Sequence, residues 1–354
     1  MIEKSDKKIH KELINWYLKN KRELPWRETE DPYPIWLSEI ILQQTRVQQG
    51  LPYYFSFLKH FPTIYDLAKA SEKEILSLWQ GLGYYSRARN LHKTAQQIVA
   101  NCGGKFPDSY KTLLELKGVG PYTAAAIASF AYKEQVAVVD GNVYRVLTRI
   151  FGIYDDITLN TTKKEIALLA QQLIPKKNPD IYNQAIMEFG AMHCTPAEPK
   201  CTGCGFAQIC VANKTGDQKV LPVKAKQKAK LSRFFNYFII QHGDVVLMKE
   251  RGGNDIWQGL YEFLLIETKK LPTFTELLDE TSGIEAEIIS AEYGPYKHVL
   301  SHQILHASFY AIKATKKQFS ALKKHYALEE INISEIASTP KPVLITKCLQ
   351  AHKF

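Results

Sequence analysis

Apolar residues recur at helical spacing through the first 212 positions, with frequent turn residues between the runs. The clearest helix starts pair a capping residue with an acid three positions later or with a following proline: Ser71 with Glu74, Thr162 with Glu165, and Asn178 with Pro179. The one strand candidate is weak and lies at 135–139, QVAVV. This pattern predicts an all-α domain of roughly ten short helices over residues 1–212.

The periodicity changes after residue 233. Two apolar runs joined by a His-Gly-Asp turn fill 234–250, and 298–312 is either a second strand pair or one long strand. One helix is expected at 274–280. The pattern predicts an α+β domain over 234–354, with residues 213–233 as a linker, and therefore a multidomain fold.

The formal net charge of +10 indicates a polyanionic partner. The linker is its most basic part, with seven Lys or Arg and one Asp between Lys214 and Arg233. This run either contacts a phosphate backbone or is a solvated tether. No secretory signal precedes the first helix and no apolar stretch is long enough to span a bilayer, so we expect a cytoplasmic protein without a membrane partner.

A carboxylate interrupts the apolar run PIWLSEIILQQT at 34–45. Glu39 has Ile, Trp and Leu residues on both sides. An ionised carboxylate loses several kcal/mol on leaving water unless it is paired or protonated. Glu39 therefore needs a structural partner or a chemical role.

The segment 108–133 reads as two helices joined by a tight turn that contains Gly118 and Gly120. Glycines without Cβ atoms let a phosphate approach the backbone, and free N–H groups at the start of the second helix attract it. The alternative is an ordinary helical hairpin in which the glycines serve packing and capping.

Asp140 ends an apolar segment and is followed by Gly141 and Asn142 at the start of a helix. It is either a plain N-cap or a functional anion. Its helix N-terminus should lower its pKa, whereas an apolar setting should raise the pKa of Glu39. One group would then donate a proton while the other stays charged, which is what cleavage of a glycosidic bond needs.

Four cysteines with the spacing C-x6-C-x2-C-x5-C form the third cluster of chemical side chains: Cys194, Cys201, Cys204 and Cys210. Four thiolates within so short a segment suit either zinc or an iron–sulfur cluster, in a reducing compartment. The usual zinc pattern has two C-x2-C pairs, and this sequence has one.

Six motifs in order resemble the adenine DNA glycosylases of the MutY type, in the helix-hairpin-helix superfamily. They are LPWR at 24–27, SEIILQQTRV at 38–47, GLGYYSRARNLH at 81–92, LKGVGPYTAAA at 116–126, VVDGNVYRVL at 138–147 and the four-cysteine spacing. The C-terminal region also resembles that family's Nudix-like domain. The resemblance implies a helix-hairpin-helix glycosylase domain with a [4Fe-4S] cluster on the four cysteines, zinc being the less favoured occupant, and a Nudix-like domain after it.

The resemblance also implies a reaction, the removal of adenine mispaired with 8-oxoguanine or G in duplex DNA. Glu39 would protonate adenine N7 and Asp140 would stabilise the cationic sugar. Tyr122 and Asn142 would support these carboxylates. The flipped base would lie among Arg27, Leu42 and Gln184.

Further residues take DNA-binding roles from the same resemblance. Gln44 and Tyr84 would fill the gap in the base stack, and Gly118 and Gly120 would contact phosphate. A sister branch that resembles endonuclease III has a catalytic lysine where this chain has Tyr122. Tyrosine cannot form a Schiff base, so base removal without efficient strand cleavage is expected from a monomeric enzyme, and a lyase side reaction through another lysine stays open.

In the C-terminal region, Ser301 and His302 would read 8-oxoguanine, although Leu300 replaces the phenylalanine common in the family. An isolated Ser-His pair could equally be two polar residues at a strand edge. The helix near Glu280 lacks the other acidic residues and the arginine of a Nudix hydrolase, so no nucleotide hydrolysis is expected. Two other classes stay open, a bifunctional glycosylase/lyase acting on oxidised pyrimidines and a non-catalytic, cluster-containing DNA-binding protein.

Overall fold

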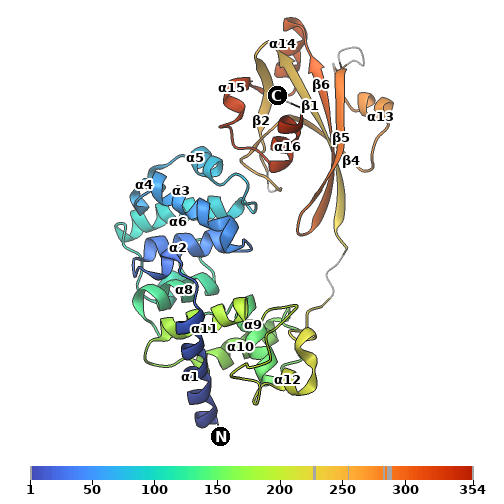
Figure 1. Ribbon diagram of the computed structural model, residues 1–354. Helices are drawn as coiled ribbons and strands as arrows, with labels where there is room; N and C mark the ends of the chain where they lie inside the picture. The colour runs from blue at the N-terminus through green and yellow to red at the C-terminus, as the bar shows by residue number, and fades with distance from the viewer. Residues whose placement is uncertain (1, 226–228, 254, 282–283, 285–288, 353–354) are drawn as a thin grey trace. The chain divides into compact units, whose positions relative to one another are not determined.

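The computed structural model describes residues 2–225, 229–253, 255–281, 284 and 289–352. The chain forms two compact units (Figure 1): Met1–Lys69 with Asn90–Lys226, and Ala70–Arg89 with Gln227–Phe354. Ala70–Arg89 therefore groups with the C-terminal residues. The domain limits drawn from the sequence stay a prediction.

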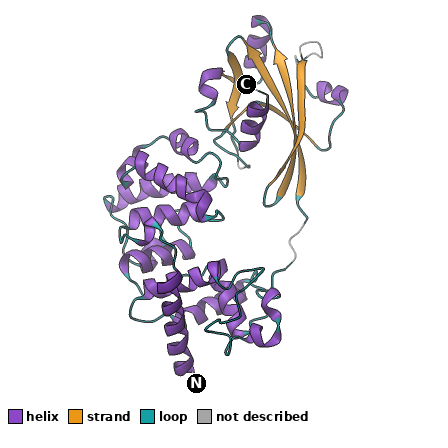
Figure 2. Cartoon of the chain, viewed as in Figure 1, coloured by secondary structure: helices purple, strands orange, loops and turns teal. Residues whose placement is uncertain are grey.

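Helices make up the regular structure of the chain up to Lys219 (Figure 2). Their bounds are α1 Ile2–Asn20, η1 Pro25–Arg27, α2 Pro32–Leu42, α3 Val47–His60, α4 Ile64–Lys69, α5 Glu72–Leu78, α6 Ser86–Cys102, α7 Tyr110–Leu113, α8 Pro121–Tyr132, α9 Gly141–Phe151, α10 Asn160–Leu173, α11 Pro179–Met192, α12 Val211–Thr215 and η2 Asp217–Lys219. The predicted all-α region is confirmed.

Local details differ from the sequence predictions in three places. The capping box of Ser71 is present, but α10 begins at Asn160, so the predicted cap at Thr162 is wrong. Thr162 is instead buried inside the helix. Asn178 precedes α11 in a left-handed conformation and its side chain makes no capping bond. The strand at 135–139 is wrong, because the Val138 N–H pairs with a side chain, the Oδ1 of Asn183, at 3.1 Å.

α2 and α8 are apolar on nearly every side and pack against each other in the first unit. A helix that is hydrophobic all round belongs in a protein interior. The alanines of α8, Ala124–Ala126, are fully buried and permit close approach of the two helices. This packing places Glu39 on α2 against Tyr122 on α8.

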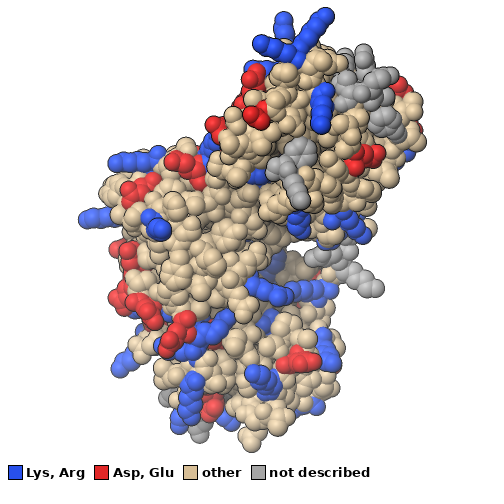
Figure 3. Space-filling model, turned by 45° about the horizontal axis from the view of Figure 1, so that its top comes forward, with Lys and Arg blue, Asp and Glu red and all other residues tan. Residues whose placement is uncertain are grey.

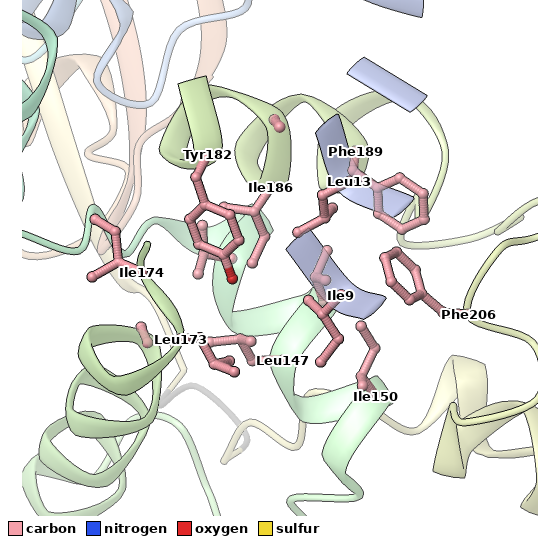
Figure 4. Close-up of a cluster of buried hydrophobic side chains, with 14 of the residues drawn as sticks. Ile9, Leu13, Leu147, Ile150, Leu173, Ile174, Tyr182, Ile186, Phe189 and Phe206 are labelled. Carbon is pink, nitrogen blue, oxygen red and sulfur yellow. The ribbon is translucent and has the colours of Figure 1, made fainter. Parts of the chain in front are cut away.

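A second core joins α1, α9, α10 and α11 (Figure 4). Ile9 and Leu13 of α1 meet Leu147 of α9 and Ile186 of α11 in this cluster. Phe206, from the segment that carries the four cysteines, packs edge-to-face on Phe189 at 5.2 Å between ring centroids. The core therefore holds α9, α11 and the cysteine segment in one arrangement.

The second unit contains a seven-stranded mixed sheet in the order β3-β2-β1-β6-β5, with β4 on β1 and β7 on β2. β1 and β6 run parallel, and the other pairs are antiparallel. The strands are β1 Leu231–His242, β2 Val245–Glu250, β3 Tyr261–Glu262, β4 Leu264–Thr268, β5 Ile289–Val299, β6 Gln303–Lys313 and β7 Glu329–Asn332. The α+β class, the hairpin after β1 and the β5–β6 pair are confirmed.

The sequence prediction of a single helix between residues 234 and 354 is wrong. Besides α13 Phe274–Asp279, the structure has α14 Lys316–His325, α15 Ile333–Ile336 and α16 Val343–Ala351. The polar helix α14 buries only Phe319 and Leu322, too few apolar positions for a visible stripe. In the part of the chain that is described, no helix is both long and apolar enough to cross a membrane.

Candidate active site

A cavity of about 680 Å³ lies within the first unit. Every residue predicted for catalysis or for the base pocket lines it: Arg27, Glu39, Leu42, Tyr122, Asp140, Asn142 and Gln184. These residues come from five separate segments of the chain. The fold thus brings together side chains that are up to 157 positions apart.

Glu39 is a buried acid of this cavity, with 7% of its surface exposed. The Tyr122 hydroxyl donates a hydrogen bond to Glu39 Oε2 at 2.6 Å. Burial is the main cause that raises the pKa of Glu39, and the negative charge of Asp140 adds to it; the hydrogen bond from Tyr122 and the charge of Arg27 act in the opposite direction, and the net pKa is about 7. At neutral pH a large fraction of Glu39 therefore carries a proton.

Asp140 precedes α9 and accepts three hydrogen bonds. Its Oδ1 accepts from the N–H groups of Asn142 and Val143 at 2.9 and 2.8 Å, and its Oδ2 accepts from Asn142 Nδ2 at 2.6 Å. Arg145 Nη2 donates to Asn142 Oδ1 at 2.7 Å and so orients this amide. Asp140 is therefore the N-cap of α9, and the side-chain amide of Asn142, two residues later, also donates to its carboxylate.

The sequence prediction of a lowered pKa for Asp140 is wrong. Burial raises the pKa of Asp140 above its ordinary value, and the hydrogen bonds from Val143 and Asn142 offset only part of this effect. The helix N-terminus was correctly identified, but the depth of the cavity was not visible in the sequence. Glu39, which accepts fewer hydrogen bonds, remains the natural proton donor of the two.

The wall formed by η1 and α11 is more polar than the sequence suggested. Tyr17 Oη donates to Gln184 Oε1 at 2.6 Å, and the Arg27 guanidinium lies over the Tyr17 ring, 5.6 Å from its centroid. Arg22 and Arg27 both pair with Glu188, whose side chain is 1% exposed. Sequence reasoning missed Glu188, although it interrupts an apolar helical run just as Glu39 does.

The α7–α8 hairpin holds its two glycines in different conformations. Gly118 has a φ of +81°, and a Cβ there would lie 2.8 Å from Asn90 Cβ. Gly120, the residue before α8, has a φ of −88° and open space around its Cβ position. Gly118 is therefore required by the turn, while Gly120 leaves an open approach to the start of α8.

Gln44 and Tyr84 are both exposed and both have positive φ, 56° and 49°. Residues other than glycine rarely adopt this backbone conformation, which costs of order 1 kcal/mol or more in free energy. Gln44 follows α2 in the first unit. Tyr84 lies in the second unit, where Trp79 Nε1 and Arg87 Nη2 donate to the Gly83 carbonyl at 3.0 and 3.1 Å. These two hydrogen bonds hold the backbone beside Tyr84 in place.

Ser301 and His302 lie between β5 and β6, on the rim of a cavity of about 570 Å³ in the second unit. Tyr84 also lines this cavity, and its hydroxyl is hydrogen-bonded to Ser301 Oγ. Arg89 and Trp257 complete one wall. Tyr84 thus shares one site with Ser301 and His302, which lie more than 200 positions later in the sequence.

The four cysteines line one hollow together with Phe189 and Phe206. Burial raises the pKa of the Cys204 and Cys210 thiols. Buried Arg149 donates to Cys194 Sγ at 3.4 Å and to the carbonyls of Thr195 and Pro196, anchoring the segment to α9. Among the described residues, no three His, Cys, Asp or Glu side chains are grouped tightly enough for a single ion.

Comparison with known proteins identifies the family. Residues 37–176 match the HhH-GPD superfamily of base excision DNA repair proteins, and residues 236–351 match the NUDIX domain. An adenine DNA glycosylase of Buchnera aphidicola from Schizaphis graminum is 32% identical over 337 residues, 94% of this chain and 95% of the relative. The chain belongs to the adenine DNA glycosylase family.

Other matches agree with this family. The adenine DNA glycosylase of Homo sapiens is 44% identical over 218 residues, which is 59% of this chain and 40% of the human protein. A thermostable thymine-DNA glycosylase of known structure aligns with a TM-score of 0.56 at 31% identity and covers 60% of this chain and 99% of its own. The first unit thus has the fold of a DNA glycosylase of base excision repair, and the second carries the Nudix-like sheet.

Proposed function

We propose that this glycosylase removes adenine paired with 8-oxoguanine or G in duplex DNA. The observation that carries the proposal is the buried Glu39, which is hydrogen-bonded to Tyr122 in the cavity shared with Asp140 and whose pKa is raised by burial. A protonated carboxyl and a nearby carboxylate are the pair that a glycosidic bond needs for cleavage.

In this proposal adenine is flipped from the duplex into the cavity, and Glu39 gives its proton to N7. The C1′–N9 bond then breaks, and the departing electrons stay on the neutral base. The negative charge of Asp140 stabilises the oxocarbenium-like sugar, with Asn142 fixing the carboxylate. Water attacks C1′ and transfers a proton to the Glu39 carboxylate, which completes the hydrolysis and restores the acid.

Arg27, Leu42 and Gln184 are proposed to hold the flipped base, since all three line the cavity. Gln44 and Tyr84 would occupy the stack that the base leaves. Gly118 and Gly120 would admit a phosphate to the start of α8.

We propose a monofunctional enzyme. A lyase needs an amine to attack C1′ and form a Schiff base. Tyr122 stands at the position of the lysine in the sister branch, and the cations lining the cavity, among the residues that the structure describes, are arginines. Guanidinium groups stay protonated and are poor nucleophiles.

The second unit is proposed to read the base opposite adenine. Ser301 and His302 offer a hydroxyl and an imidazole beside Tyr84 at an accessible cavity. Nucleotide hydrolysis is not expected here, because Glu280 lacks the accompanying acidic residues of a Nudix metal site. Part of the stretch in question, residues 282–283, lies outside the described residues.

A [4Fe-4S] cluster is the proposed occupant of the cysteine hollow, with Cys194, Cys201, Cys204 and Cys210 as ligands. The donor set fits, because the thiols of all four cysteines line the hollow, beside the imidazole of His193. The cluster would supply a covalent link across a segment that has little regular structure of its own. Arg149 would stabilise the thiolate of Cys194 by its hydrogen bond.

We further propose that the enzyme acts as a monomer on duplex DNA in the cytoplasm. The net charge of +10 suits a phosphate-rich partner. In a bacterial cell this location would include the nucleoid.

The test is single-turnover incubation with duplexes that hold A opposite 8-oxoguanine, G or T. Products are resolved before and after alkali for the wild type and Glu39→Gln. We expect adenine loss from the first two duplexes, with strand breaks only after alkali, and a loss of activity of at least about a hundredfold in the variant.

Other outcomes would point to the remaining classes. Strand cleavage without alkali would indicate a glycosylase/lyase, especially on duplexes with oxidised pyrimidines. Binding of all duplexes without release of any base would indicate a non-catalytic DNA-binding protein.

A further inference from the structure

Glu188 is the most deeply buried charged group on the wall of the base cavity, with 1% of its side chain exposed. Four hydrogen bonds reach its carboxylate. Oε1 accepts from the backbone N and the Nε of Arg22 at 3.0 and 2.7 Å. Oε2 accepts from the Nη2 atoms of Arg22 and Arg27 at 2.7 and 2.8 Å.

This saturation excludes a direct role with the base. A carboxylate offers about four lone-pair directions, and all are used by the two arginines. A bound base would have to displace a charge-assisted hydrogen bond to reach Glu188. The residue therefore acts through its partners.

Arg27 is the partner that faces the chemistry. It lines the cavity with Glu39, and its Nη1 donates to the Arg22 carbonyl at 2.9 Å. Its other neighbours are the Tyr17 ring beneath it and Glu188 on α11. Both arginines contribute positive charge to this wall, and Glu188 is the acid paired with them.

We propose that Glu188 is a positioning residue that fixes Arg27 in the base cavity and offsets its positive charge on the wall that faces Glu39. This inference rests on the proposed role of Glu39 as the acid. Without Glu188, two guanidinium charges would be left without their acid in a largely buried wall, and positive charge favours the ionised form of a carboxyl group.

A substitution of Glu188 leaves the other groups that face Glu39 unchanged. Tyr122 on α8 donates to Glu39, and Asp140 before α9 adds negative charge. The charge of Arg27 lowers the pKa of Glu39. The arrangement therefore predicts the sign of the change: neutralising Glu188 lowers the pKa of Glu39.

The experiment compares Glu188→Gln, which removes the charge at similar shape, with Glu188→Asp, which keeps the charge on a shorter side chain. Single-turnover adenine release from A:8-oxoguanine duplex is measured from pH 5 to 9. Glu165→Gln, an exposed acid on α10 away from the cavity, removes the same charge as a control.

For Glu188→Gln we expect the alkaline limb of the profile to move down by about 0.5 to 1 pH unit, so release is about three- to tenfold slower at pH 8 and closer to wild type at pH 5. Glu188→Asp and Glu165→Gln should keep the wild-type limb. An equal loss at every pH in both Glu188 variants, or an unmoved limb in Glu188→Gln, would overturn the proposal.

A second readout does not need base release. The Glu39 carboxyl carbon is followed by NMR during a pH titration of the free protein, with Glu39→Gln as the assignment control. A lower midpoint in Glu188→Gln supports the inference even if the wild type releases no adenine, and an unchanged midpoint refutes it. Thermal melts before each titration restrict the comparison to folded protein.

Discussion

The two carboxylates of the cavity differ because their immediate neighbours differ. Glu39 is buried and accepts one hydrogen bond from a neutral hydroxyl, whereas Asp140 accepts two from backbone N–H groups and one from an amide. Burial raises the pKa of both, and the extra donors restrain that of Asp140. Proton donor and anion are thus distinguished by hydrogen-bond count rather than by residue type.

Glu39→Gln should stabilise the protein in a pH-dependent way. Because the folded pKa of Glu39, about 7, lies above the unfolded value, folding stability is lost as pH rises through about 7. Glutamine does not ionise, so the variant does not lose this stability as the pH rises. We expect similar free energies of unfolding for the two proteins near pH 4.5 and a gain of roughly 2 to 3 kcal/mol for the variant at pH 8.

Urea denaturation at the two pH values checks this prediction. The control is Glu165→Gln, because Glu165 is exposed and should change stability little at either pH. A Glu39→Gln variant that is less stable than wild type at pH 8 would show that Glu39 is a structural ion in this cavity.

At the scale of elements, the helix pairs α2–α8 and α9–α11 form the cavity. The tight turn before α8 depends on Gly118, whose φ of +81° and contact with Asn90 exclude a side chain. Gly120 has neither constraint. Gly118 is therefore needed for the fold of the hairpin, whereas Gly120 is available to a ligand.

Gly118→Ala and Gly120→Ala should separate folding from DNA binding. We expect Gly118→Ala to lose about 1 to 3 kcal/mol of stability, from strain and the clash with Asn90. Gly120→Ala should be within about 0.5 kcal/mol of wild type yet bind duplex DNA several-fold more weakly, because its methyl group occupies the open approach. Urea denaturation and fluorescence anisotropy measure the two effects, and equal stability of the two variants would contradict the assignment of Gly118.

Sequence patterns predicted most elements but not all boundaries. The paired apolar runs of β1 and β2 and the Ser71 cap were readable because the signal is local. The start of α10 was not, since Leu159 is the capping residue there and makes no side-chain bond. α14 escaped notice because its packing against the sheet depends on two apolar side chains.

At the scale of the whole molecule, the residues proposed for catalysis and those proposed for lesion reading lie in different units. The proposed acid and anion lie in the first unit, and Tyr84, Ser301 and His302 lie in the second. Because the two groups lie in different units, recognition of the opposite base should be separable from base release. Figure 3 shows basic and acidic side chains interspersed over the face in view, so the net charge is not confined to one patch there.

Tyr84→Phe and Ser301→Ala should reduce lesion preference to a similar extent. Each removes one side of the hydrogen bond between the two hydroxyls while the ring or backbone stays in place. We expect the preference for A:8-oxoguanine over A:G to fall about five- to tenfold in either variant and little further in the double variant. Tyr154→Phe is the matched control, since Tyr154 is similarly exposed, at 46% against 44% for Tyr84.

Competition binding with the two duplexes measures this preference. Additive losses in the double variant would mean that Tyr84 and Ser301 act independently, and an unchanged preference in both single variants would remove them from lesion reading.

The local chemistry could be read from neighbouring residues. An acid in an apolar run, an aspartate before a helix, four cysteines in one segment and the two apolar runs of β1 and β2 are local features, whereas the strand expected at 135–139 is absent. Which of these groups share a cavity depends on the packing of the helices. This packing brought Glu39, Tyr122 and Asp140 together, added Glu188 behind Arg27, and raised rather than lowered the pKa of Asp140. The physical reason is that burial and electrostatics sum over all neighbours in space, and helix packing sets those neighbours.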